Sequence, residues 1–64
     1  MPFVEIKMWK GRDKETKKKM IENVTEAISE TIVCPREAVQ VVVIEVEKDD
    51  WAIGGKLCSE RKPG

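Results

Sequence analysis

The sequence predicts a small α/β domain, formed by one βαβ unit with parallel strands and a C-terminal β-hairpin. Four observations lead to this prediction. Alternating apolar residues open the chain, a long stretch with helical periodicity follows, and a valine-rich run comes next. A Gly-Gly pair between two short apolar runs lies near the end. Strand, helix and strand in this order are typical of a parallel pair with a helical crossover, and a length of 64 residues predicts a single domain, residues 1–64.

The first strand is predicted at Phe3–Trp9, where apolar residues occupy every second position. Pro2 stands directly before this strand and directly after the initiator methionine. If Met1 is removed, Pro2 carries a free secondary amine. An α-amino group has a reference pKa of about 7.7 to 8.0, so it can serve as a base near neutral pH. A proline also suits a strand start for purely structural reasons, because it lacks a donor for the ladder.

A turn at Lys10–Arg12 is predicted to lead into a helix of about 20 residues. Asp13 is a suitable N-cap. The apolar residues at helical spacing are Met20, Ile21, Val24, Ala27, Ile28 and Ile32. The residue before a proline is pushed out of helical geometry, so Cys34-Pro35 predicts a helix end near Val33. The lysine triplet on the outer face has glutamate neighbours, which favours a solvated face over an anion-binding patch.

The second strand is predicted at Val39–Val46, which is apolar on both faces over most of its length. A single helix covers only one face of a two-stranded sheet, and both sheet edges are open. We therefore expect a symmetric homo-oligomer. Trp51–Ile53 and Lys56–Leu57 flank the Gly-Gly pair and predict a hairpin. The polar end, Ser59–Gly64, is expected to fray.

Composition excludes several classes of function. The formal net charge is zero, which argues against non-specific nucleic-acid binding. No apolar run is long enough for a membrane span and no signal-peptide pattern is present, so a cytoplasmic protein without membrane contact is expected. The lack of histidine removes Ser/His/Asp and Cys/His catalysis and the common metal sites. The two cysteines have no zinc-site spacing and are expected to be reduced thiols, so no metal or cofactor is predicted.

Three side chains are candidates for ligand binding. Arg12 lies beside the start of the predicted helix, and an arginine next to free backbone N–H groups suits a carboxylate. An exposed surface arginine is the simpler alternative. Trp9 and Trp51 are the only tryptophans. They could be core or interface anchors, or they could line an apolar pocket.

Four segments together resemble the 4-oxalocrotonate tautomerase family over residues 2–58. They are Met1-Pro2 before a strand, Gly11-Arg12 before a long helix, Cys34-Pro35 before a valine strand, and Trp51-Ala52-Ile53-Gly54-Gly55-Lys56. The resemblance implies a βαβ fold with a C-terminal hairpin. It also implies assembly of dimers into a homohexamer, with a dimer or trimer as alternatives, and active sites at subunit boundaries.

The resemblance assigns roles to individual residues. Pro2 matches the family's catalytic proline, which acts as general base after the methionine is removed. Arg12 matches the arginine that binds a substrate carboxylate. Trp51 stands where the family usually has a phenylalanine that walls the pocket. Trp9 stands where a backbone amide contributes to substrate binding.

Gln40 departs from the family pattern. The family's second arginine should stand there, and a neutral amide cannot replace its charge. Arg36, one turn earlier, is a candidate replacement. The implied function is proton transfer in a 2-hydroxydienoate or 2-oxo-enoate acid, with weak activity on the standard dicarboxylate or a different preferred substrate. The alternatives are a hydratase or dehalogenase of unsaturated acids, and a non-catalytic oligomeric subunit or binding module.

Overall fold

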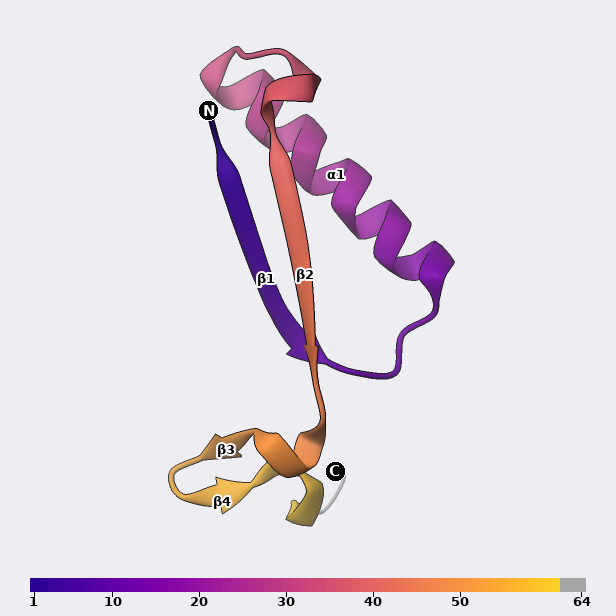
Figure 1. Ribbon diagram of the computed structural model, residues 1–64, viewed down its shortest axis with the longest axis vertical. Coiled ribbons are helices and arrows are strands. Elements are labelled where there is room, and N and C mark those ends of the chain that lie inside the picture. Colours follow the sequence, from indigo (N-terminus) through magenta and orange to yellow (C-terminus); the bar gives the residue numbers. More distant parts are fainter. Residues whose placement is uncertain (62–64) are drawn as a thin grey trace.

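The computed structural model describes residues 1–61 and has the predicted order of strand, helix, strand and hairpin (Figure 1). Its elements are β1 (Phe3–Trp9), α1 (Lys14–Ile32), β2 (Gln40–Val46), β3 (Ala52–Ile53) and β4 (Lys56–Leu57). Short 3-10 helices lie before β2 at Arg36–Ala38, before β3 at Lys48–Asp50 and after β4 at Cys58–Glu60. The second strand begins at Gln40 and not at Val39 as predicted. The last part of the segment expected to fray, residues 62–64, lies outside the described residues.

β1 and β2 pair in parallel along their whole length, from Phe3 opposite Gln40 to Trp9 opposite Val46. The ladder continues beyond the start of β1, because the Gln40 amide donates to the Pro2 carbonyl over 3.0 Å. Each residue of β1 therefore has a defined neighbour on β2. As a consequence, Pro2 lies beside the start of β2 and Trp9 lies beside its end.

Both ends of α1 are capped. At the start, Asp13 Oδ1 accepts a hydrogen bond from the Thr16 amide over 2.9 Å, and this hydrogen bond lowers the pKa of the Asp13 carboxyl. At the end, Val33 has a φ of 56°, a left-handed conformation that is uncommon for a β-branched residue. The Ser29 hydroxyl donates to the Cys34 carbonyl over 2.6 Å and holds this turn. The predicted N-cap and the predicted helix end are both confirmed.

β3 and β4 form an antiparallel hairpin in which Ile53 lies opposite Lys56. Gly54 and Gly55 make its two-residue turn with φ values of 62° and 84°, and glycine adopts such positive values without strain. Figure 1 shows the hairpin beyond the end of the β1–β2 pair and not stacked on the sheet. The hairpin is therefore an arm that extends from the βαβ unit.

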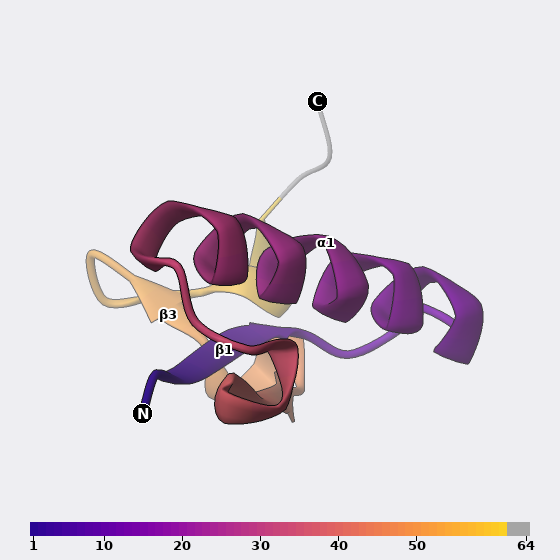
Figure 2. The ribbon, with the colours of Figure 1, turned by 90° about the horizontal axis from the view of Figure 1, so that it is seen from above.

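The single chain buries little of its apolar surface. Within residues 1–61, Cys58 is the only buried hydrophobic residue, at 5% exposure, whereas Phe3 is 62% exposed. The radius of gyration is 14.9 Å, compared with about 10.7 Å for a compact domain of this length. α1 lies along one face of the sheet (Figure 2), and Phe3 and Val42 alternate onto the other face. The chain therefore leaves apolar side chains exposed on the face of the sheet that α1 does not cover.

One ion pair joins α1 to β2. Lys17 Nζ lies 2.9 Å from Glu45 Oε1, and the two side chains are 27% and 26% exposed. The hydrogen bond from Lys17 lowers the pKa of the Glu45 carboxyl. A carboxyl group whose pKa is lowered on folding stabilises the fold at neutral pH. That contribution is lost as the pH falls below the usual glutamate value of about 4.3 and through the folded value.

We expect Glu45→Gln to lower the melting temperature near neutral pH, and this difference from wild type to shrink as the pH falls below the usual glutamate pKa of about 4.3 and through the lowered folded value. Thermal denaturation followed by circular dichroism over a series of pH values from neutral to acid measures the effect. Glu47→Gln is the matched control, since its ion pair with Lys10 spans 3.3 Å and both side chains are more than half exposed. A smaller effect is expected there. A Glu45→Gln difference that is unchanged in acid would contradict the prediction.

Candidate active site

Two predicted site residues, Pro2 and Gln40, lie together at the start of β1, and we call this pair the proline end. Pro2 is half-buried, and its carbonyl accepts the hydrogen bond from the Gln40 amide. Met1 precedes it and is 88% exposed, so a processing enzyme can reach this residue. The Gln40 side-chain amide donates to the Met1 sulfur over 3.2 Å. Removal of Met1 would therefore free both the Pro2 nitrogen and the side-chain amide of Gln40.

The other three predicted residues, Trp9, Arg12 and Trp51, lie together at the opposite end of β1, and we call this group the arginine end. They share a cavity of about 320 Å³. Its lining residues are Ile6, Met8, Trp9, Arg12, Met20 and Trp51. The two indole rings meet edge to face, with centroids 6.1 Å apart and planes at 80°. Both tryptophans thus serve as walls of an apolar cavity that has one charged residue.

Trp9 is held on more than one side. The Lys48 ammonium lies 4.8 Å from the centroid of its ring, within range of a cation–π interaction. The Trp9 indole nitrogen is buried and has no hydrogen-bond partner in the part of the chain that the structure describes. The Cys58 backbone amide donates to the Trp51 carbonyl over 2.7 Å. This hydrogen bond fixes the backbone of Trp51, whose ring meets that of Trp9. These contacts position the indole pair.

Arg12 lies in the exposed loop between β1 and α1. It takes part in none of the ion pairs found within residues 1–61. The sequence placed it at an anion site built with the free amides of the helix start. In the structure the Asp13 carboxylate accepts the Thr16 amide, so that amide is already satisfied. At this place the Arg12 guanidinium is therefore the main group that can bind an anion, and the helix amides contribute less.

The proline end and the arginine end are separated by the length of β1. Seven residue steps from Pro2 to Trp9 correspond to about 23 Å in a strand. Figure 1 shows the N-terminus and the β1–α1 loop at opposite ends of the β1–β2 pair. No single small molecule can reach both ends of one chain. A site that contains Pro2 and Arg12 must lie between two chains.

A protein-family model described as Tautomerase enzyme matches residues 2–61. The chain belongs to the tautomerase family. The chain is 44% identical over 61 residues to a probable tautomerase of Bacillus cereus, a match that covers 95% of this chain and 100% of the relative. It is 42% identical over 60 residues to a 2-hydroxymuconate tautomerase of Bacillus subtilis, covering 94% and 97% of the two chains.

Solved structures share the fold of this chain. The crystal structure of a homologue of 4-oxalocrotonate tautomerase has a TM-score of 0.90 at 39% identity, covering 95% of this chain and 100% of that chain. A heterohexamer 4-oxalocrotonate tautomerase from Chloroflexus aurantiacus has a TM-score of 0.91 at 26% identity, covering 97% and 100%. The resemblance noted in the sequence and the predicted fold of a βαβ unit with a hairpin are both confirmed.

Sequence reasoning missed four residues at the arginine end. Ile6, Met8 and Met20 line the cavity, and Lys48 lies over the Trp9 ring. The periodicity assigned Met8 and Met20 to apolar faces, which is where they lie, but it gave no sign that they meet Trp9. Lys48 had no signal, because it stands in a charged loop where a solvated lysine is the ordinary expectation.

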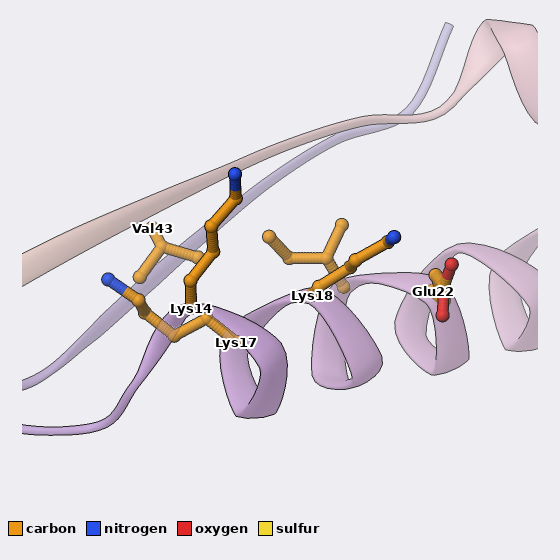
Figure 3. A pocket seen from close by; sticks show the side chains of 6 residues that line it. Lys14, Lys17, Lys18, Glu22 and Val43 are labelled. Atoms are coloured by element: carbon orange, nitrogen blue, oxygen red, sulfur yellow. The ribbon is translucent and has the colours of Figure 1, made fainter.

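A larger cavity, of about 520 Å³, lies away from both ends of β1, between α1 and β2. Figure 3 shows the side chains of Lys14, Lys17 and Lys18 around it. Its full lining is Lys14, Lys17, Lys18, Ile21, Glu22 and Val43, which includes none of the predicted site residues. The size of a cavity therefore does not locate the candidate site in this chain.

Further features of the chain concern thiols, metals and membranes. Cys34 and Cys58 are free thiols, as predicted. Within residues 1–61, no group of three or more His, Cys, Asp or Glu side chains is placed to hold a metal ion. None of the helices in that range has the length and apolar character needed to cross a membrane.

Proposed function

We propose that this protein is an isomerase that moves a proton within a 2-hydroxydienoate or 2-oxo-enoate acid, with Pro2 as general base once Met1 has been removed. The observation that carries this proposal is the position of Pro2. It heads β1 directly behind an exposed Met1, and its carbonyl is tied to the start of β2. The family match begins at this residue. The name of the Bacillus subtilis relative, 2-hydroxymuconate tautomerase, supports a substrate of this kind.

The chemistry follows from a free prolyl nitrogen. Its lone pair takes the proton of the substrate's 2-hydroxyl group, and the negative charge spreads over the conjugated dienolate. The protonated amine then returns the proton to a carbon of the chain, which gives the 2-oxo product. A base with a pKa near the working pH serves both steps, and an α-amino group with a reference pKa of about 7.7 to 8.0 meets this condition.

The other predicted residues serve binding. Arg12 holds a substrate carboxylate through the paired N–H groups of its guanidinium. Trp9 and Trp51 wall the conjugated body of the substrate and exclude water, which strengthens polar interactions inside the site. Gln40, beside Pro2, donates a neutral hydrogen bond to the developing dienolate oxygen. A neutral donor stabilises that charge less than an arginine would.

The active site is shared between subunits of a homo-oligomer. The proline end and the arginine end of one chain lie about 23 Å apart, so Pro2 acts with Arg12 of a neighbouring copy. The exposed Phe3 and Val42 offer apolar surface for that contact. A hexamer fits best, because the Chloroflexus aurantiacus relative is a heterohexamer, with a dimer or trimer as the smaller alternatives.

The lining of the arginine end favours an isomerase over the alternatives. A hydratase or dehalogenase activates water and usually brings a carboxylate base. Among the described residues, no aspartate or glutamate lines the cavity that holds Arg12. A non-catalytic binding module would not require the exposed Met1 and the proline behind it. Proton transfer needs only the amine and a held carboxylate.

A mixing experiment tests the shared site. One variant carries a glycine inserted between Met1 and Pro2, so its proline nitrogen is an amide, and the other carries Arg12→Gln. Each alone should be nearly inactive. After the two are denatured, mixed in equal amounts and refolded, about one quarter of the sites should combine an intact Pro2 with an intact Arg12 from the other chain. Turnover of 2-hydroxymuconate, followed by its absorbance, measures the recovery.

The controls are each variant refolded alone, and size-exclusion chromatography of the mixture. A mixture no more active than the sum of its parts, although mixed oligomers have formed, would mean that each site lies within one chain. That result would overturn the shared site and leave the role of Pro2 to be judged from its own variants.

A further inference from the structure

The cavity at the arginine end has one charged side chain in its lining. Five of its six lining residues are apolar or aromatic, and Arg12 is the sixth. A carboxylate that moves from water into this apolar lining needs a cation beside it, because an unpaired buried charge is costly. The lining thus provides for one carboxylate.

The nearby cations do not provide for a second one. Lys10 pairs with Glu47 over 3.3 Å. Lys48 does not line the cavity, and its ammonium lies over the Trp9 ring. Arg12 remains as the cation that both lines the cavity and takes part in no ion pair within residues 1–61.

The proline end adds no positive charge from a side chain. Gln40 is a neutral amide, and it lies beside Pro2. Arg36, the candidate replacement for the family's second arginine, has its guanidinium 3.9 Å from Glu26 on α1. Among the residues that make up the two ends of this chain, Arg12 is the only one with a cationic side chain.

The indole pair indicates the shape of the ligand. Trp9 and Trp51 stand at 80° to each other, so they form two walls that meet at a corner. A flat conjugated chain can stack on one ring while its edge meets the other. Met8 and Met20 offer further apolar contact along the body of such a chain.

We propose that the preferred ligand of this site is a flat unsaturated monocarboxylate, with its carboxylate on Arg12 and its apolar body between Trp9 and Trp51. The proposal rests on the proposed function, because it takes this cavity to be half of the active site. A dicarboxylate of the same length would place its second carboxylate against apolar side chains or the Gln40 amide without a counter-charge. The chain therefore selects against dicarboxylates.

Sorbate and trans,trans-muconate test this selection. They share one conjugated carbon chain and differ in a terminal methyl group against a second carboxylate. Trp9 and Trp51 are the only tryptophans and both line the cavity, so quenching of tryptophan fluorescence reports binding at this place. We expect sorbate to bind at least about tenfold more tightly than muconate. Equal or tighter binding of muconate, or no quenching by either acid, would overturn the proposal.

Two variants locate the cause of the preference. Arg12→Gln should weaken sorbate binding by about tenfold or more, whereas Arg36→Gln, the matched control, should leave it unchanged. Gln40→Arg should raise the affinity for muconate by about tenfold with little change for sorbate. If Gln40→Arg strengthens sorbate as much as muconate, a second charge is not what the site lacks, and the proposal fails.

The same titration in the glycine-insertion variant separates this proposal from the proposed function. That variant has no free prolyl amine but keeps the arginine end. Sorbate preference without any turnover in wild type would support the ligand class and reject the isomerase. Turnover that depends on Pro2 together with a preference for muconate would support the isomerase and reject the ligand class.

Discussion

A glycine inserted between Met1 and Pro2 is expected to lower kcat for the conversion of an enol substrate by on the order of 10² to 10⁴-fold. The insertion keeps the proline ring but turns its nitrogen into an amide, which has no lone pair available as a base. The exposed Met1 shows that the chain start has room for an added residue. Stopped-flow or steady-state absorbance of 2-hydroxymuconate measures the loss.

Pro2→Ala is the matched control for this insertion. Alanine also permits removal of Met1, so the variant keeps a terminal amine but loses the ring and its secondary nitrogen. We expect a rate between wild type and the insertion variant. Mass spectrometry of each protein must show whether Met1 has been removed. Wild-type rates in the insertion variant would exclude the prolyl nitrogen from the mechanism.

The pH profile separates a chemical role of Pro2 from a structural one. In wild type, kcat/KM should rise with pH as the free amine loses its proton, near the reference range of about 7.7 to 8.0 or below it. The insertion variant has no such amine beside the substrate, so its residual activity should lack this rise. An unchanged profile in the insertion variant would assign the titrating group to another residue.

Arg12→Gln is expected to lower kcat/KM by about 10- to 150-fold, the equivalent of roughly 1.5 to 3 kcal/mol for a hydrogen bond to a charged group. Arg12 is the only charged residue that lines the cavity of the arginine end, so nothing else there can take over the carboxylate. Most of the loss should appear in KM, because the carboxylate is held in both the ground state and the transition state. Initial rates over a range of substrate concentrations separate the two constants.

Arg36→Gln is the control for Arg12→Gln. Arg36 lies 3.9 Å from Glu26, and both side chains are more than half exposed, so its removal should change kcat/KM by less than about twofold. Arg12→Lys should recover part of the activity, since it restores the charge without the paired N–H groups. If Arg36→Gln is as damaging as Arg12→Gln, Arg36 is the replacement for the family's second arginine.

Residues whose role depends on local geometry were predictable from the sequence. Asp13 was expected as an N-cap and accepts the Thr16 amide, and Cys34-Pro35 was expected to end the helix and does so. The same local rule limited one expectation. Asp13 satisfies an amide at the helix start, so the anion site foreseen there depends on Arg12 and less on the helix.

Residues whose role depends on distant neighbours were only partly predictable. Trp9 and Trp51 were recognised as either anchors or pocket walls, and the structure places them in one cavity with Arg12. Lys48 was not singled out, although its ammonium lies over the Trp9 ring. A charged residue in a loop carries no periodic signal, so only its position in space shows which side chain it contacts.

The amino-acid sequence determined the order and type of the elements and the family, because the spacing of apolar residues follows the repeat of the backbone. It also determined that Pro2 can become a terminal amine. Only the tertiary structure decided that Arg12 and both tryptophans share one cavity while Pro2 and Gln40 lie a strand length away. The physical reason is that contacts between segments distant in sequence place these groups: the parallel register sets Gln40 beside Pro2, and the chain after β2 returns Trp51 to the ring of Trp9.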